Sequence, residues 1–207
     1  MVDTRTDTRD VADYLARVFV GMAGEDVVSV LPTVLRRLAE GRPVDTATLA
    51  AELGRPTAAL DALLDRFGVE RDDAGRVVGA GLTLRPTPHR FTVGGRLLYT
   101  WCALDALVFP SLLGEPADVE SPCPATGAMV RVRVGPTTVA SAVPEGAMVS
   151  FLVSDDERVR QAFCEHVHFF ASADAAADWL ASNPGGSVRP VREAFEIGRQ
   201  LAARVGW

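Results

Sequence analysis

The sequence predicts an α+β protein, with a helical N-terminal module followed by a mixed core of short strands and helices. Three observations support this fold class: apolar residues recur at helical spacing near the N-terminus, Gly and Pro break the following chain into short β-like runs, and strands and helices do not alternate regularly. A chain of 207 residues, 48% hydrophobic and 23% charged, suits a small module and a larger globular domain. We place these two parts at residues 1–84 and 85–207.

Two amphipathic helices are expected first. Apolar side chains at three- and four-residue intervals predict helices over 11–22 and 27–40. Pro32 lies near the first turn of the second helix or kinks it, and Gly41 ends it.

The next segment predicts a helix-turn-helix followed by a β-hairpin. Residues 44–54 carry capping residues at one end and a glycine at the other, and Thr57 can cap a second short helix. Apolar runs within 69–84 flank a turn rich in Asp, as in a hairpin. The combination is typical of a winged helix, but the second helix presents Asp61 and Asp65 where a DNA-reading helix needs basic or amide side chains. We therefore expect a packing module rather than a DNA-binding one.

The remaining chain is predicted to form short strands and four helices. Strands are expected at 91–93 and 96–99, paired as a hairpin around two glycines, and then near Val119 and at 129–134, 147–153 and 167–171. Helices are expected at 101–113, which is apolar enough to be buried, and at 155–163, 173–182 and 192–204.

The charge and the N-terminal sequence exclude some partners. A net charge of −6 argues against nucleic acid and against anionic membrane surfaces, which both attract clustered positive charge. Residues 1–10 contain no apolar segment of the kind found in signal peptides, and no run approaches the roughly 18–20 apolar residues of a membrane span. We expect a cytoplasmic protein.

Cys102 and Asp105 form the first candidate site. If the surrounding segment is helical, their three-residue spacing puts thiol and carboxyl on one face among large apolar side chains. Burial without a cation raises the pKa of a carboxyl, so Asp105 could hold a proton at neutral pH and donate it. In the alternative, Asp105 hydrogen-bonds a backbone amide and Cys102 only packs. On spacing alone the alternative is preferred.

Cys164 forms a second candidate site with His166 and His168. Such a group resembles a set of zinc ligands, and in an extended segment both histidines would point the same way. A closed zinc site needs four ligands at familiar spacings, and no C-x-x-C or H-x-x-x-H partner occurs. Zinc binding and a structural role for the histidines both stay open.

Cys123 is interpreted as structural, because prolines on both sides fix its turn and remove amide donors. Three cysteines are an odd number and lie far apart, so we expect free thiols rather than disulfides.

Together these stretches resemble the organomercurial (alkylmercury) lyase family. The resemblance runs from about Val27 onward, in the family's order and spacing. It is carried by RRLAEGRPV at 36–44, GLTLR at 81–85, LYTWCALD at 98–105, CPATG at 123–127 and FCEHVHFFAS at 163–172.

The resemblance implies a winged-helix-like N-terminal region packed on an α+β catalytic core. It implies that Cys102, Asp105 and Cys164 are catalytic and that Cys123 is structural. Some members carry a further cysteine directly after the one matching Cys164, where this chain has Glu165. The difference puts little in doubt, because that thiol is not among the family's required residues.

The implied reaction is protonolysis of a carbon–mercury bond to a hydrocarbon and Hg(II). Mercury is a soft metal that prefers thiolates, so Cys102 and Cys164 would capture the organomercury compound and hold the product, with Asp105 nearby. Asp105 would relay a proton from a thiol to the carbon.

An apolar pocket that includes Trp101, Phe163 and Tyr99 would admit the organic group and exclude water. No bound cofactor is expected, while small thiols and a mercuric reductase would remove Hg(II). Two alternatives from other classes remain: a thiol-based soft-metal carrier without turnover, and a winged-helix transcriptional regulator.

Overall fold

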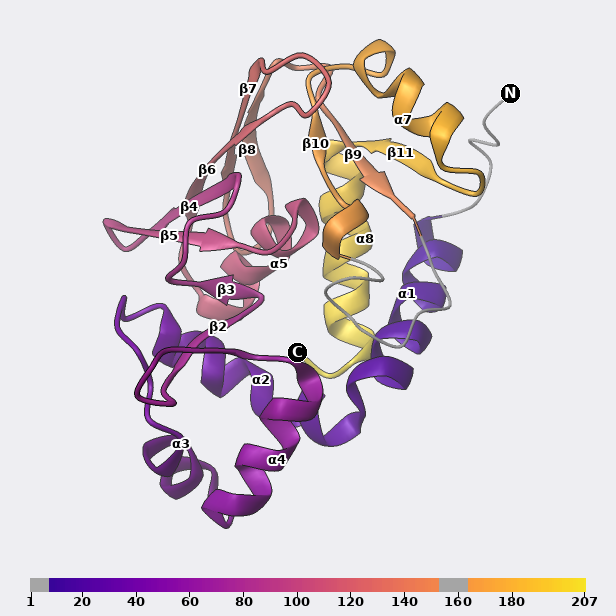
Figure 1. Ribbon diagram of the computed structural model, residues 1–207. Coiled ribbons are helices and arrows are strands. Elements are labelled where there is room, and N and C mark those ends of the chain that lie inside the picture. Colours follow the sequence, from indigo (N-terminus) through magenta and orange to yellow (C-terminus); the bar gives the residue numbers. More distant parts are fainter. Residues whose placement is uncertain (1–7, 153–163) are drawn as a thin grey trace.

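The structure is a computed structural model and describes residues 8–152 and 164–207. It is a mixed α+β arrangement, as predicted. Helices α2 to α4 lie at one end, α1 lies alongside the long helix α8, and two antiparallel sheets with the central helix α5 make up the rest (Figure 1).

The four N-terminal helices are α1 (Thr8–Ala23), α2 (Glu25–Leu38), α3 (Thr46–Leu53) and α4 (Thr57–Phe67), close to the predicted bounds. Asp45 caps α3 by accepting the amides of Ala47 and Thr48, and Gly54 ends it in the left-handed conformation. The prediction that Thr57 caps α4 is wrong. Pro56 occupies the cap position, because its fixed φ suits the entrance to a helix, and Thr57 is already helical.

The larger sheet has eight strands in the order β1-β2-β3-β5-β4-β6-β7-β8. They are β1 (Glu70–Arg71), β2 (Val77–Ala80), β3 (Leu82–Thr83), β4 (His89–Val93), β5 (Arg96–Thr100), β6 (Ala117–Pro122), β7 (Met129–Val134) and β8 (Val139–Val143). Both predicted hairpins, β1–β2 and β4–β5, are present. The sequence analysis missed β8, whose Val-Ala-Ser-Ala-Val sequence is mostly exposed and shows no alternation of large apolar side chains.

The smaller sheet has the order β10-β9-β11, with β9 (Met148–Phe151), β10 (Phe169–Phe170) and β11 (Ser187–Pro190). The predictions at 147–153 and 167–171 match β9 and β10, apart from residue 153, which lies outside the described residues. The short strand β11 was not predicted. The predicted helix over 155–163 also lies outside the described residues.

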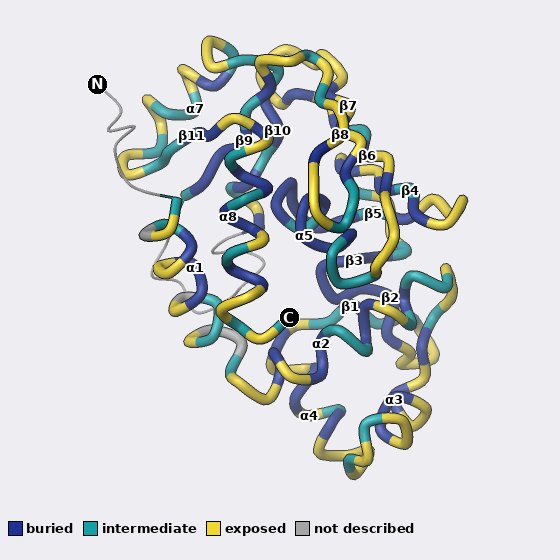
Figure 2. The backbone as a smooth tube through the Cα atoms, turned by 180° about the vertical axis from the view of Figure 1, so that it is seen from behind, coloured by how far each residue is buried: buried dark blue, intermediate teal, exposed yellow. Residues whose placement is uncertain are grey.

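The remaining helices are α5 (Ala103–Leu113), the 3₁₀ turns η1 (Cys164–His166) and η2 (Asp174–Ala176), α7 (Ala177–Ser182) and α8 (Val191–Arg204). Seven of the eleven residues of α5 are buried, in line with the prediction of a buried helix, and in Figure 2 it lies inside the molecule between the large sheet and α8. The two helices approach closely at Gly198, where a Cβ atom would come within 2.6 Å of Val108 Cγ2.

The larger sheet crosses the predicted boundary between residues 84 and 85. Strand β3 pairs with β5, opposite Thr100 and Tyr99, and one hydrophobic cluster includes side chains from α1 to α4 and from α5 and α8. The division into 1–84 and 85–207 stays a prediction.

By length and composition, none of the described helices alone could cross a membrane, although α1 and α2 pass the same test as a pair bent by 97°.

Candidate active site

Cys102 lies where β5 ends and α5 begins. Its backbone is extended, and its Sγ accepts the backbone amide of Asp105 at 3.4 Å, so that the fully buried thiol occupies the N-cap position of α5. The sequence analysis placed both residues on one face of a helix. Capping, rather than a shared helical face, brings the thiol to the first turn.

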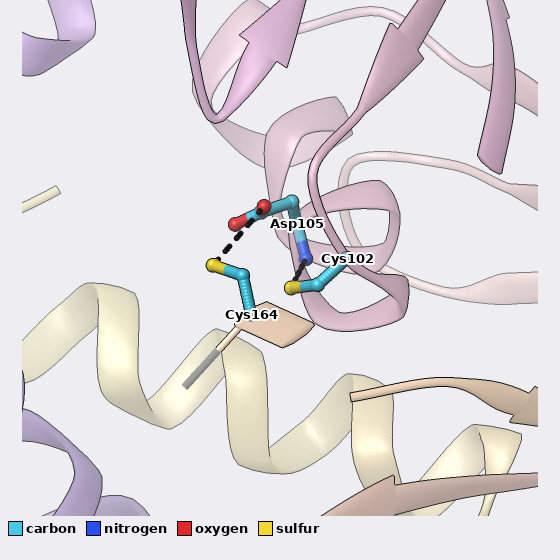
Figure 3. Close-up of side chains that lie close together, drawn as sticks. All are labelled: Cys102, Asp105 and Cys164. Carbon is cyan, nitrogen blue, oxygen red and sulfur yellow. Dashed lines mark hydrogen bonds between the residues drawn. The ribbon is translucent and has the colours of Figure 1, made fainter. Parts of the chain in front are cut away.

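Asp105 lies in the first turn of α5, with its carboxyl turned toward Cys164 (Figure 3). Burial raises the pKa of this carboxyl from 3.8 to about 6, and hydrogen bonds with Cys102 offset part of the rise. The sequence also predicts a raised pKa for the Asp105 carboxyl. A pKa of about 6 leaves most of the carboxyl ionised at pH 7, so the carboxylate is able to accept a proton.

Cys164 comes from η1, far along the chain, where one backbone hydrogen bond closes the turn and a second attaches it to α5. The amide of Val167 donates to the carbonyl of Cys164 at 3.3 Å, and the amide of Ala103 donates to the carbonyl of Val167 at 3.1 Å. Cys164 Sγ then lies 4.0 Å from Asp105 Oδ2, the long limit for a thiol donor.

The ligand atoms of Cys102, Asp105 and Cys164 all lie within 4.8 Å of one another. Within residues 8–152 and 164–207 no other three Cys, His, Asp or Glu side chains form such a group. Burial, together with the neighbouring Cys164 and Asp105, holds the pKa of Cys102 well above its usual value, so this thiol keeps its proton until a partner accepts it. The two sulfurs of Cys102 and Cys164 and a carboxylate that can accept a proton therefore lie close together in one small group.

Asp105 and Cys164 face an otherwise apolar cavity. Its aromatic wall comes from α1, α4, α5 and the chain around them, through Phe19, Phe67, Trp101, Phe109 and Trp207. Aliphatic side chains from α2, α5 and α8 complete it, namely Leu31, Leu104, Val108 and Leu201, beside Ala80 and Gly81. Such a space suits an organic group bound next to two thiols.

The family model and the relatives that are similar to this chain carry the name alkylmercury lyase. The family model described as alkylmercury lyase (MerB) matches residues 82–203. The alkylmercury lyase of Staphylococcus epidermidis is 51% identical over 83% of this chain and 80% of its own length. The alkylmercury lyase of Pseudomonas putida is 43% identical over 99% and 96%.

The chain belongs to the alkylmercury lyase family.

A solved structure agrees with this membership. The crystal structure of the mercury-bound form of MerB2 superposes with a TM-score of 0.77 at 25% identity, covering 98% of this chain and 100% of that one. The likeness to an alkylmercury lyase fold therefore extends well beyond the matched residues 82–203.

Of the three pocket residues predicted from the sequence of this alkylmercury lyase family member, Trp101 lines the cavity described above. Tyr99, half-buried on β5, is not among the described residues that line it, and Phe163 lies outside the described residues. The sequence analysis missed the contributions of Phe19, Phe67 and Trp207. Phe19 and Phe67 lie on helices distant in sequence and Trp207 follows α8, so only the tertiary fold brings them to the cavity.

A buried glutamate, also missed, holds Trp101 in place. Trp101 Nε1 donates to Glu70 Oε1 at 3.2 Å, and Thr83 Oγ1 donates to Glu70 Oε2 at 2.5 Å. The Trp101 amide donates to the carbonyl of Gly81 at 2.8 Å, and its ring stacks on Phe67. The residue next to Cys102 is thereby fixed on several sides.

Gly81 leaves room for the site. It has a φ of +88°, and a Cβ atom there would meet Phe109 Cζ at 2.8 Å and approach Asp105 Cγ at 3.9 Å. A side chain at this position would press on the wall of the cavity beside the carboxyl.

The histidines do not belong to the thiol and carboxyl group. His89 is buried with Nδ1 at 2.9 Å from Ser121 Oγ, and burial lowers its pKa to about 4. Burial and the neighbouring His166 lower the pKa of His168. Within the described residues, His166 and His168 form no group of three ligands, so the zinc interpretation gains no support.

Cys123 lies in a separate hydrophobic cluster with Phe170, Ala176 and Val188. Its amide donates to the carbonyl of Ala128, and its carbonyl accepts the amide of Gly127, which closes the turn between β6 and β7. Its structural role stays a prediction, and this packing is consistent with it.

Proposed function

We propose that this enzyme, an alkylmercury lyase, cleaves the carbon–mercury bond of organomercury compounds with Cys102, Cys164 and Asp105. The observation that carries the assignment of residues is the convergence of two thiols and one carboxyl within 4.8 Å, with Cys164 and Asp105 of this group lining an apolar cavity. Mercury prefers sulfur ligands, and replacing the carbon ligand by a second sulfur requires a proton for the departing carbon. Cys102 and Cys164 supply the two sulfur ligands, and Asp105 can carry the proton.

In the first step, a thiol gives its proton to Asp105 and its sulfur binds mercury. Cys164 is placed for this role, because its Sγ faces Asp105 Oδ2. The ionised carboxylate takes the proton, the sulfur lone pair forms the S–Hg bond, and the ligand that accompanied R–Hg⁺ leaves.

In the second step, Cys102 adds the second S–Hg bond and the carbon leaves. Two sulfur ligands raise the negative character of the carbon, and the proton on Asp105 adds to it as the C–Hg bond breaks. The electron pair of the C–Hg bond becomes that of the C–H bond. The Cys102 proton replaces the one that Asp105 has delivered. The products are R–H and Hg(II) held by two thiolates.

Two small thiols then exchange for the protein sulfurs and release Hg(II), and their protons restore the free thiols of Cys102 and Cys164. Asp105 loses to solvent the proton that it took from Cys102, which returns the ionised carboxylate. We propose that this exchange, or hand-off to a mercuric reductase, completes turnover without a bound cofactor. A cytoplasmic location fits a reaction that depends on reduced small thiols.

We also propose that helices α2 to α4 and the hairpin β1–β2 form a winged-helix-like packing module within residues 1–84. The acidic side chains of α4 support packing over DNA binding. Asp61 and Asp65 both pair with Arg71, at 3.0 and 2.9 Å, and so are engaged within the module.

Benzene release from a phenylmercury compound, measured with excess small thiol, tests the assignment. Cys102→Ala, Cys164→Ala and Asp105→Ala should each abolish or greatly reduce release, while Cys123→Ala is the matched control. Undiminished release by any of the first three variants would remove that residue from the mechanism. A protein that binds mercury through both thiols but releases no benzene would instead be a soft-metal carrier.

A further inference from the structure

Four aromatic rings follow one another along the wall of the active-site cavity. Trp207 meets Phe19 edge to face at a centroid distance of 5.5 Å, Phe19 meets Phe67 at 6.4 Å, and Phe67 stacks on Trp101 at 6.1 Å. Trp101 precedes Cys102 in sequence, and all four rings line the cavity. The row therefore begins beside the thiols and ends at Trp207.

Trp207 separates this cavity from a hollow on the surface. The hollow is lined by residues of α1, α2 and the chain after α8, namely Val20, Glu25, Val28, Ser29, Pro32, Arg204, Val205, Gly206 and Trp207. Of the described residues, Trp207 alone lines both spaces. On α2, Val28 faces the hollow and Leu31, almost one turn later, faces the cavity. The C-terminal end of the trace lies beside these helices in Figures 1 and 2.

A proline in α2 provides the attachment point for Trp207. In an α-helix the carbonyl of Val28 would accept the amide of the residue four positions later, but that residue is Pro32, which has no amide hydrogen. Trp207 Nε1 donates to this carbonyl at 2.8 Å instead. The carbonyl that the proline leaves without its helical donor is thus satisfied by the indole.

We propose that Trp207 is the gate of the active-site cavity, and that the size of the organic group admitted to the thiols depends on its release from Val28. The proposal rests on the lyase function proposed above. The indole is held by one side-chain hydrogen bond, an edge contact with Phe19 and packing on the hydrophobic cluster, while the Trp207 amide donates to the carbonyl of Ala202 at 2.8 Å and fixes the backbone. Rotation of the side chain alone therefore joins the surface hollow to the cavity without unfolding either helix.

Labelling of individual cysteines tests the gate without any lyase reaction. Each protein is treated with a bulky maleimide at fixed pH, and labelling at each cysteine is followed by mass spectrometry. Trp207→Phe, which keeps a ring but loses the N–H donor, should speed labelling of Cys102 and Cys164 about fivefold, the factor expected for one hydrogen bond. Trp207→Ala should speed it more, and Cys123 should label at the wild-type rate in both.

Pro32→Ala is the variant least at risk of misfolding, because it removes a proline from a helix interior. The new amide competes with the indole for the Val28 carbonyl, so labelling of Cys102 and Cys164 should rise although Trp207 is unchanged. Trp179→Ala is the matched control: Trp179 packs beside the cluster of Cys123, so this variant should expose Cys123 alone.

Wild-type labelling of Cys102 and Cys164 in Trp207→Phe and Pro32→Ala would overturn the gate, and so would equal acceleration at all three cysteines. Turnover gives the second measurement. Trp207→Ala should raise kcat/KM for a naphthylmercury compound relative to methylmercury, and an unchanged ratio counts against the gate. Absence of hydrocarbon release from the wild type would refute the lyase function and leave the labelling result standing.

Discussion

The two regions that contain buried cysteines differ in what surrounds the sulfur. Cys102, Cys164 and Cys123 are 0%, 5% and 2% exposed, and all three are free thiols. Burial raises the pKa of Cys123, but hydrogen bonds with Thr126 and with backbone groups outweigh it and the net pKa is lowered. At Cys102 burial dominates and the pKa is raised. Of Cys102 and Cys123, the more acidic thiol is therefore Cys123, which lies outside the candidate site.

A lowered pKa of a single buried thiol therefore does not by itself mark this kind of site. A second sulfur and a carboxyl that can take the thiol proton distinguish the region of Cys102 from that of Cys123. Substitutions confined to one of the two regions should therefore change activity and stability independently.

The largest expected effect is on turnover in Asp105→Asn. The amide keeps the shape of the carboxyl but cannot accept and return a proton, so benzene release should fall by about 10²- to 10⁴-fold. Steady-state assays with phenylmercury and excess thiol measure the change. A loss of less than tenfold would show that solvent or the thiols supply the proton without Asp105.

The same variant should be more stable than the wild type. The folded-state pKa of about 6 lies above the unfolded value of 3.8, so folding favours the protonated carboxyl and the free energy of unfolding falls as pH rises between these values. Asp105→Asn removes this penalty and should gain up to about 3 kcal/mol at pH 7. Urea unfolding at pH 7 and pH 4 checks it, because the gain should nearly vanish at pH 4.

Cys123→Ala should lower stability and leave turnover unchanged, the reverse of the effects expected for Asp105→Asn. It removes a buried sulfur from a small cluster and should lower the free energy of unfolding by about 1–3 kcal/mol, with kcat and KM for phenylmercury unchanged. Denaturation and turnover are measured on the same preparation. A drop in kcat at a temperature where the variant is fully folded would place Cys123 in the reaction after all.

The smallest effect is expected in Glu70→Gln. The amide still reaches Trp101 and Thr83, but loss of charge weakens two hydrogen bonds, so Trp101 becomes less well fixed beside Cys102. KM for phenylmercury should rise about fivefold, with kcat nearly constant. Trp101→Phe, which cannot donate to Glu70, is the companion variant. If Glu70→Gln lowers kcat and leaves KM unchanged, Glu70 acts on the chemical step rather than on the pocket.

Much of the fold could be predicted because its elements carry local signals. The periodicity of α1 and α2, the cap and glycine of α3, and the glycines between β4 and β5 act within a few residues. Strand β8 could not be found in this way, because it has one buried residue and gains its place from pairing with β7.

The candidate site was likewise predictable only in part. Cys102 and Asp105 are neighbours in sequence, but spacing favoured a structural interpretation, and the match to Cys164 came from the family resemblance. The cavity walls were not predictable, since Phe19 and Trp207 meet only after α1 packs against α8. Nor was the role of Glu70, because an acid beside a surface turn gives no sign that it will be buried under an indole.

The position of Cys102 at the start of α5 makes the sulfur serve two purposes that compete. The lone pair that accepts the Asp105 amide is electron density that a bound metal also draws on. Loading the site with Hg(II) should therefore loosen the first turn of the helix, and the amide of Asp105 becomes a natural reporter. Its NMR shift and hydrogen exchange should register mercury capture directly, with no dye or coupled assay.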